Sequence, residues 1–190
     1  MLLLVGLGNP GSTYTNTRHN IGFKIIDAIN TQFKLSKQKP KFKGLLTTGN
    51  IEEKKIYAIK PLTFMNNSGT AIKELIDYFK IDAKNVFVFH DDMDIDFGKI
   101  KAKFGGSSAG HNGIESIDKF IGKDYSRVRI GIGHPKQKKK VNNHVLEDFK
   151  EDEEEKINEI AENIVKQLPT LIEKKIDLFS SKVNQELNGV

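Results

Sequence analysis

The chain opens with MLLLVGLGNPG (Met1–Gly11), an unbroken apolar run that ends in a cluster of glycines. A continuous apolar run of this kind is typical of a strand buried on both faces, as in a parallel sheet. The glycines predict a tight turn where the strand ends. That turn places an amide, Asn9, at the carboxyl end of the strand, which is where open α/β sheets bind their ligands.

Strands and helices alternate along the rest of the chain. Apolar residues spaced three or four apart predict helices near 21–33, 68–79 and 110–121. Short apolar or alternating runs predict strands at 55–60, 86–89, 98–104 and 127–132. The expected fold is an α/β, single-domain sandwich over residues 1–190, with a twisted mixed, largely parallel central sheet flanked by helices.

The last third of the sequence is helical in pattern. Acidic residues 151–155 fall in its first turns, where negative charge complements the helix dipole. Pro169 is expected to kink or divide this helix. Residues 38–44 and 136–140 are predicted to be loops, and nothing in the sequence suggests a domain boundary.

Composition narrows the class of protein. The 190 residues include no cysteine, which excludes disulfides, thiolate metal sites and a cysteine nucleophile. The apolar start has no basic leader and is short, so we expect neither a signal peptide nor a membrane span, and a cytoplasmic location. The formal net charge of +5 suits a polyanionic partner.

Polar side chains recur at the ends of the predicted strands and at helix starts: Asn9, His19, Asn66, Asp91 and Asn112. If the strands are parallel neighbours, these side chains converge in one crevice. A His–Asp pair makes an oriented general base for water, and amides can bind the oxygen that becomes negative. The predicted chemistry is hydrolysis of an activated acyl bond without metal or covalent intermediate. Taken alone, His19, Asn66, Asp91 and Asn112 are each better explained as a polar residue at a helix start or as a helix or loop cap.

Other catalytic interpretations fit less well. Gly6–Gly11 matches a dinucleotide-binding pattern, but Pro10 interrupts it and no helical periodicity begins before residue 21. A calcium loop starting at Asp92 would place Phe97 where glycine is needed. Residues 105–110 form no nucleophile elbow and are predicted to be a flexible loop that could gate the site.

Basic residues alternate on two predicted strands. Lys99, Lys101 and Lys103 share one face of the first strand, and Arg127 and Arg129 share one face of the second. Together they could clamp a phosphate. Lysines also blunt exposed sheet edges, so the pattern alone leaves both interpretations open.

Six motifs follow one another along most of the first 135 residues. They are 5–11 (VGLGNPG), Tyr14 with 17–22 (TRHNIG), 60–61 (KP) with 63–69 (TFMNNSG), 90–94 (HDDMD), 105–106 (GG) with 110–113 (GHNG), and 129–135 (RIGIGHP). With these motifs in this order, the sequence resembles bacterial peptidyl-tRNA hydrolases.

The resemblance implies a monomeric enzyme without cofactor or metal that cleaves the ester between a peptide and tRNA and recycles tRNA from stalled translation. It implies His19 as the base and Asp91 as its partner. The residues that would position water or substrate are Asn9, Asn66 and Asn112, with Tyr14, Met65 and His111 on the substrate side.

The partner implied is peptidyl-tRNA, recognised through its acceptor stem, 5′ phosphate and 3′ CCA end. Lys101, Lys103 and Arg129 match the family's phosphate clamp. His144 departs from the pattern, because an aromatic residue is expected there. Two further function classes remain open, a non-catalytic RNA-binding module and a dinucleotide-dependent enzyme.

Overall fold

The computed structural model describes residues 1–135 and 141–189. Its strands are β1 (Leu2–Gly6), β2 (Lys39–Lys41), β3 (Gly44–Ile51), β4 (Lys54–Pro61), β5 (Val86–Asp92), β6 (Ile100–Phe104) and β7 (Ser126–Gly131). Its α-helices are α1 (Ile21–Gln32), α2 (Ser68–Phe79), α3 (Asn112–Ile121), α4 (Val141–His144), α5 (Glu151–Ile172) and α6 (Ile176–Leu187). No helix among these residues is long and apolar enough to cross a membrane.

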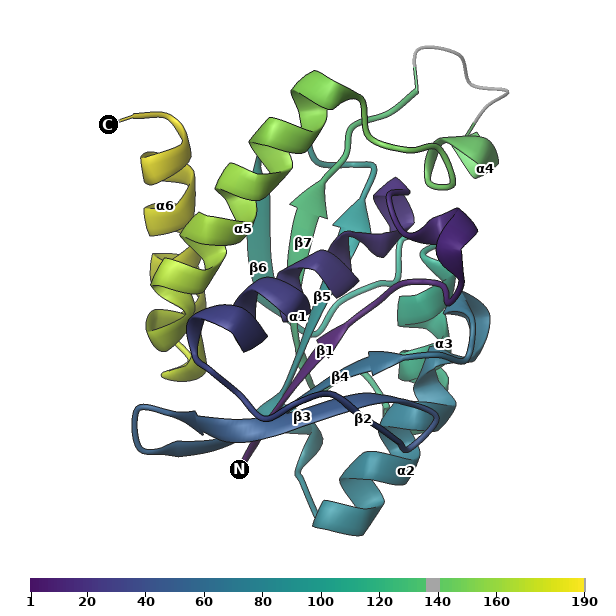
Figure 1. Ribbon diagram of the computed structural model, residues 1–190, viewed down its shortest axis with the longest axis vertical. Helices are drawn as coiled ribbons and strands as arrows, with labels where there is room; N and C mark the ends of the chain where they lie inside the picture. Colours follow the sequence, from purple (N-terminus) through teal and green to yellow (C-terminus); the bar gives the residue numbers. More distant parts are fainter. Residues whose placement is uncertain (136–140, 190) are drawn as a thin grey trace.

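Within the described residues the strands form one seven-stranded sheet in the order β2-β3-β4-β1-β5-β7-β6 (Figure 1). The four central strands, β4, β1, β5 and β7, pair in parallel. β2, β3 and β6 join through antiparallel pairings at the two sides. The mixed, largely parallel sheet expected from the sequence is therefore confirmed.

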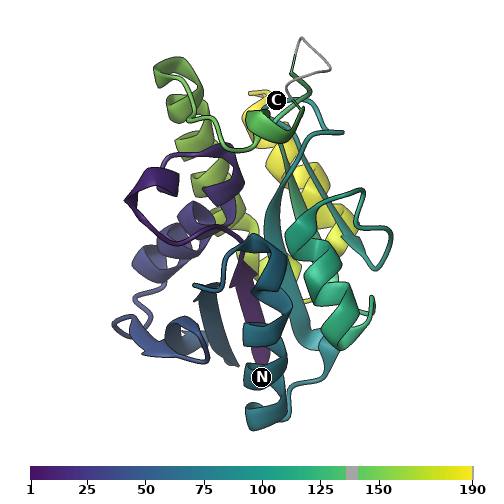
Figure 2. The ribbon, with the colours of Figure 1, turned by 90° about the vertical axis from the view of Figure 1, so that its right-hand side faces the viewer.

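Helices cover both faces of the sheet (Figures 1 and 2). Leu2, Leu4, Phe87 and Phe89 pack with apolar residues of α1, α5 and α6. The alternate residues of the same strands, among them Leu3, pack with α2 and α3. Because every second side chain of a central strand meets a different helical layer, no polar face is tolerated there, which explains the apolar run that opens the chain.

The first turn of the chain matches the expectation from its glycines. α1 begins at Ile21, well after the glycine cluster, and short 3-10 turns fill the interval. Gly22 allows this helix to approach the sheet closely, since a Cβ there would overlap backbone atoms of Leu7 and Phe89. The helix can therefore lie directly against β1 and β5, and this packing fixes the position of His19, two residues before α1.

Three expectations about secondary structure are wrong. Residues 39–41 form edge strand β2 and Gly44 begins β3, although the sequence predicts a loop over 38–44. α5 continues through Pro169 to Ile172, so this proline does not divide the helix. β6 starts at Ile100, so Lys99 lies outside the strand. The loop predicted at 136–140 falls outside the described residues.

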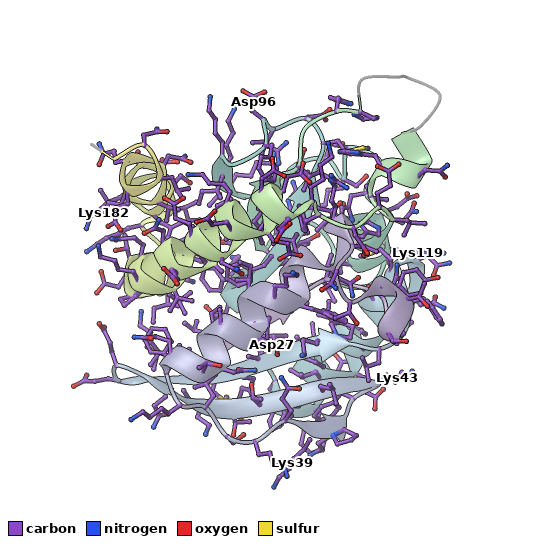
Figure 3. The ribbon with its side chains drawn as sticks, turned by 45° about the horizontal axis from the view of Figure 1, so that its top comes forward. Asp27, Lys39, Lys43, Asp96, Lys119 and Lys182 are labelled. Carbon is purple, nitrogen blue, oxygen red and sulfur yellow. The ribbon has the colours of Figure 1, made fainter. Side chains whose placement is uncertain are left out.

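Both side edges of the sheet are protected. On β6, the Asn184 side chain of α6 accepts a hydrogen bond from the Ile100 N–H at 3.0 Å and donates one to its carbonyl at 2.8 Å. Ser180 Oγ accepts from the Ala102 N–H at 2.8 Å. The opposite edge, β2, is the exposed sequence Lys-Pro-Lys, whose Lys39 is labelled in Figure 3. Lysine and proline on an edge strand disfavour pairing with another chain.

Candidate active site

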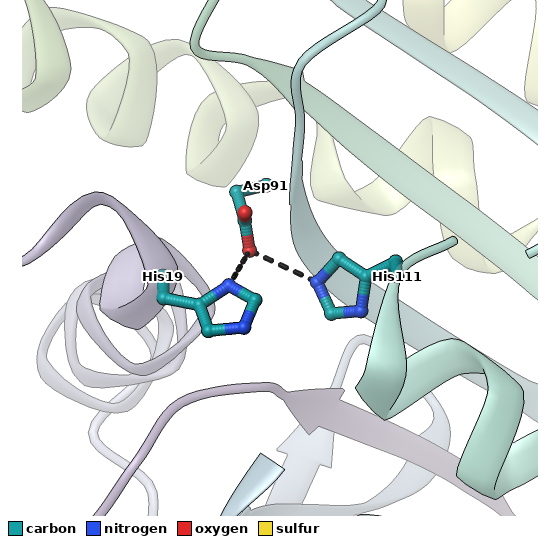
Figure 4. Close-up of side chains that lie close together, drawn as sticks. All are labelled: His19, Asp91 and His111. Carbon is teal, nitrogen blue, oxygen red and sulfur yellow. Dashed lines mark hydrogen bonds and ion pairs between the residues drawn. The ribbon is translucent and has the colours of Figure 1, made fainter. Parts of the chain in front are cut away.

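Asp91 lies at the carboxyl end of β5, where it meets helices from both faces of the sheet (Figure 4). Its Oδ1 lies 2.8 Å from Nδ1 of His19, in the 3-10 turn that leads into α1. The same oxygen lies 3.0 Å from Nε2 of His111, the N-cap residue of α3. The carboxylate thus connects two imidazoles that come from opposite helical layers.

The hydrogen bonds assign the tautomer of each ring. His111 Nδ1 accepts from the backbone N–H groups of Gly113 and Ile114, at 3.1 and 3.3 Å, so its proton is on Nε2 and points at Asp91. His19 donates to Asp91 through Nδ1, which leaves the lone pair of its Nε2 for a water molecule. A histidine held in this way can act as an oriented general base.

Electrostatics keep the Asp91 carboxylate ionised. The side chain is 2% exposed, and burial alone would raise its pKa. Charge interactions and hydrogen bonds with His19 and His111 outweigh burial and hold the pKa of Asp91 well below its ordinary value. A permanent negative charge at this point stabilises positive charge as it develops on His19.

The side chains of His19, Asp91 and His111 also place three possible metal-ligand atoms within 4.8 Å of one another. A metal would need the lone pair of His111 Nε2, yet the two helix amides require the lone pair of Nδ1 and leave the proton on Nε2. The donor set therefore fits a hydrogen-bonded network better than a metal site.

Asn9 is held in place by three hydrogen bonds with Met65 and Asn20. Its Oδ1 accepts from the Met65 backbone N–H at 2.7 Å. Asn20 accepts from the Asn9 backbone N–H at 2.8 Å and donates to its carbonyl at 2.9 Å. Since the side-chain oxygen of Asn9 is engaged, its NH2 group is the part left to bind an oxygen of a ligand.

Two clefts meet at His19, Asn112 and Val145. The Asp91 cleft is lined by polar and small residues that include Asp91, Asp92, Ser108 and His111. The Met65 cleft is lined on its other side by Asn9, Phe64, Met65, Asn66 and Leu146. Phe64 is 54% exposed and Leu146 is 46% exposed, so the rim of the Met65 cleft is apolar.

The structure thus brings together most of the predicted site residues. His19, Asn9, Met65, Asn66 and Asn112 line the Met65 cleft, and both asparagines 66 and 112 are exposed. Tyr14 packs against Phe64 of the cleft wall, with the two rings edge-to-face and 6.4 Å between their centroids. It contacts the wall of the cleft and is absent from its lining.

The basic residues share one face of strands β6 and β7. Lys101 pairs with Arg129 and Lys103 pairs with Arg127 across the antiparallel ladder, which confirms that the strands are neighbours. Burial, Arg127 and Arg129 lower the pKa of Lys103. Arg129 is oriented by Asp92, whose Oδ2 accepts from its Nε at 2.7 Å. Because Asp92 also lines the Asp91 cleft, the cationic face lies beside that cleft.

Arg127 has a different role from its neighbours. Its guanidinium is buried and donates to the carbonyl oxygens of Gly105 and of Ser107, the latter at 2.7 Å. These bonds hold the loop 105–110, which also lines the Asp91 cleft through Ser108 to Gly110. The loop predicted from the sequence as a gate is therefore fastened at its first half to the cationic strands.

A C-terminal strap, residues 145–149, fixes the backbone of His19. The His19 N–H donates to the Val145 carbonyl at 2.8 Å, and the Arg18 N–H donates to the Glu147 carbonyl at 3.0 Å. The buried Arg18 side chain also donates to the Asp148 carbonyl at 2.8 Å and to Glu153 at 2.7 Å. His144, which departs from the expected pattern, precedes the strap and contacts the Ile132 carbonyl through Nε2 at 3.2 Å.

Sequence reasoning assigned no role to Arg18, Asn20, His90, Asp92 or Val145. Arg18 and Asn20 flank His19, and His90 and Asp92 flank Asp91, so adjacency to a candidate catalytic residue was the available signal. Val145 gives its backbone carbonyl to His19 and lines both clefts, and an isolated valine in the sequence indicates neither role.

Comparisons with known proteins agree with this geometry. A model of the family described as peptidyl-tRNA hydrolase matches residues 3–189. The peptidyl-tRNA hydrolase of Pelagibacter ubique is 71% identical over 186 residues, which cover 98% of this chain and 100% of the relative. That of Ehrlichia canis is 46% identical over 185 residues, which cover 97% and 95%. The crystal structure of peptidyl-tRNA hydrolase from Acinetobacter baumannii superposes with a TM-score of 0.91 at 33% identity, covering 97% of this chain and 94% of that one. The chain therefore belongs to the peptidyl-tRNA hydrolase family.

Proposed function

We propose that this chain hydrolyses the ester between a peptide, or an N-blocked aminoacyl group, and the 3′-terminal adenosine of tRNA. The observation that carries the proposal is the His19–Asp91 pair, whose tautomer leaves His19 Nε2 as an acceptor where two clefts meet. The ester would lie across that junction. The apolar rim of the Met65 cleft suits the peptide, and the Asp91 cleft, beside the cationic strands, suits the tRNA end.

The reaction then needs one water and no covalent intermediate. His19 Nε2 takes a proton from the water as its oxygen attacks the ester carbonyl. The negative charge that develops on the carbonyl oxygen is stabilised by amide NH2 groups, for which Asn9, Asn66 and Asn112 are the candidates. The proton passes from His19 to the departing 3′ oxygen, which gives a peptide carboxylic acid and a tRNA with its 3′ hydroxyl restored. The acid then releases its proton to solvent and becomes a carboxylate.

Binding of tRNA would involve the 5′ phosphate of the acceptor stem and the 3′ CCA end. The Nε of Arg129 is engaged by Asp92, so the terminal nitrogens of Arg129, with Lys101 and Lys103, would bind the phosphate. We further propose that residues 1–190 act as one domain and as a monomer, in the cytoplasm, where tRNA from stalled translation is recycled.

The primary test measures release of free tRNA from purified N-blocked aminoacyl-tRNA. Wild type should release it, and His19→Ala, still folded and still binding tRNA, should not. His134→Ala is the matched control, because His134 is exposed and pairs with Asp94 outside the catalytic pair. If folded wild type leaves the ester intact over a range of pH, hydrolysis is refuted and RNA binding without chemistry becomes the leading hypothesis.

The phosphate clamp has a separate test. Alanine at Lys101, Lys103 or Arg129 should raise KM with little effect on kcat. Each substitution should also reduce the slope of log affinity against log salt by about one, because one cation no longer neutralises a phosphate. The same variants should lose little affinity for tRNA from which the 5′ phosphate has been removed. An equal loss for both tRNA forms would place the 5′ phosphate elsewhere.

A further inference from the structure

His90 is a buried imidazole between the candidate catalytic site and the cationic strands. It precedes Asp91 on β5, pairs with Arg129 in the parallel ladder, and is 2% exposed. Its neighbour two residues earlier, Val88, packs with α2 and α3, so alternation puts His90 on the face of the sheet that α3 covers. The proposed reaction makes no use of this ring.

The hydrogen bonds of His90 define its chemical state. Its Nδ1 lies 2.7 Å from the backbone carbonyl of Asp91, which can only accept, so Nδ1 carries the proton. Its Nε2 is buried and has no hydrogen-bond partner among residues 1–135 and 141–189. Burial and the neighbouring His111 lower the pKa of His90 well below its ordinary value, so the ring is neutral at physiological pH.

The ring of His90 also packs against the second imidazole of the site. The rings of His90 and His111 meet edge-to-face, with 4.8 Å between centroids and planes at 72°. The other neighbour of His111 is His19, at 4.9 Å between centroids. His111 therefore lies between the two rings while both of its nitrogens are engaged, one by the amides of α3 and the other by Asp91.

We propose that His90 is a positioning residue that holds His111, and through it Asp91, in the geometry that orients His19. The inference rests on the proposed function, because it assigns a part to residues of that same site. The edge-to-face contact restrains the ring of His111 from one side, and the Nδ1–H bond to the Asp91 carbonyl fixes the end of β5 from the other.

Two substitutions separate these contributions. His90→Phe keeps an aromatic ring against His111 and removes the hydrogen bond to the Asp91 carbonyl. His90→Asn keeps a donor near the position of Nδ1 and removes the ring. Since His90 itself lines neither the Asp91 cleft nor the Met65 cleft, each variant should lower kcat about 3- to 10-fold and leave KM within about twofold. A variant that only loosened the fold would also lower the apparent kcat at unchanged KM, because part of the enzyme would be inactive. The kcat of each variant is therefore expressed per folded, tRNA-binding molecule.

A double-mutant cycle tests whether the effect passes through His111. In a His111→Ala background, His90→Asn should cause no further loss of kcat, because the ring that it restrains is gone. A full additional loss in that background, or a His111→Ala variant with unchanged kcat, would overturn the inference.

Imidazole ¹⁵N spectra supply a readout that does not depend on turnover. Wild type should show His111 with its proton on Nε2 and His90 with its proton on Nδ1 and no titration between pH 5 and 8. His90→Asn should shift and broaden the His111 signals. If wild type releases no tRNA, the proposed function fails while these spectra still decide the inference. Unchanged His111 spectra in a folded His90→Asn variant, or the opposite His111 tautomer in wild type, would refute it.

Discussion

Replacement of Asp91 by asparagine isolates the contribution of one negative charge to catalysis. Asparagine has nearly the same shape as aspartate and can still present an oxygen to both His19 and His111. It removes the negative charge from the oxygen that accepts hydrogen bonds from His19 Nδ1 at 2.8 Å and from His111 Nε2 at 3.0 Å. The variant therefore tests whether the carboxylate acts electrostatically or only as a spacer.

The magnitude follows from these two bonds. A hydrogen bond to a charged group contributes about 1.5–3 kcal/mol and a neutral one about 0.5–1.5 kcal/mol, so each bond weakens by about 1–1.5 kcal/mol. Only the bond to His19 becomes stronger as that ring takes up a proton, so about 1–1.5 kcal/mol of the loss affects the barrier, which corresponds to a kcat roughly 5- to 12-fold lower. The loss belongs in kcat because His19 becomes positive only as it takes the proton from water, and Asp91 needs no contact with substrate.

The assay is the release of tRNA from N-blocked aminoacyl-tRNA under saturating and limiting substrate. Asp92→Asn, one residue along the chain, is the comparison, because Asp92 orients Arg129 and has no contact with His19. It should raise KM severalfold and leave kcat within about twofold. An Asp91→Asn enzyme that keeps kcat within threefold of wild type would refute the assignment of Asp91 as the electrostatic partner of His19.

Three further perturbations test other features of the structure. Gly106→Ala should weaken tRNA binding without changing kcat in the saturated enzyme, because Gly106 has φ 102° and a Cβ there would overlap Lys103. The affinity for tRNA is measured over a range of salt concentrations, and an unchanged affinity would contradict the prediction. Arg18→Ala should lower the free energy of unfolding by about 3 kcal/mol, because the Asp148 carbonyl of the C-terminal strap and the Glu153 carboxylate both lose their buried partner. Urea titration measures this change, and a decrease far below 1 kcal/mol would show that other contacts hold the strap. Burial and Asp118 raise the pKa of Tyr125, so the protonated side chain contributes fully to stability below the ordinary tyrosine pKa of about 10, and this contribution is lost as pH rises above that value. Tyr125→Phe should therefore reduce the loss of unfolding free energy measured between pH 9 and 11. An unchanged slope of unfolding free energy against pH would exclude Tyr125 as the source of the loss.

The central fold could be predicted because its elements are defined by local periodicity. β1, β5 and β7 are short apolar or alternating runs, and α1 and α2 repeat apolar residues every three or four positions. The hairpin of β2 and β3 could not, because all three residues of β2 are exposed and show no apolar alternation. Its existence depends on pairing with β4, which is a tertiary interaction.

Pro169 shows how packing overrides local preference. A proline inside a helix costs about 3 kcal/mol, which favours a break at that residue. In the structure Leu168, Leu171 and Ile172 on either side of it are all buried in the core. Burial of three such side chains contributes roughly 1.5–3 kcal/mol each, enough to carry the helix through the proline.

The candidate site also has features that could be predicted from the sequence and features that could not. His19, Asp91 and the asparagines could be predicted to converge, because the carboxyl ends of parallel strands meet at one edge of a sheet. The contacts that orient them could not. The strap lies more than 120 residues from His19 in sequence, and the tautomer of His111 depends on how its ring meets the amides of α3.

The cover that α6 places over β6 has a consequence for synthesis of the chain. Asn184 and Ser180 follow Ile100 and Ala102 by 84 and 78 residues along the chain, so these two strand residues lack their partners until α6 has left the ribosome. During elongation the growing polypeptide therefore carries an unpaired strand edge, the kind of surface that recruits other nascent chains. Premature termination just before α6 would make that edge permanent. Such fragments should accumulate as insoluble material or be degraded, although every residue of the proposed catalytic site would already have been translated.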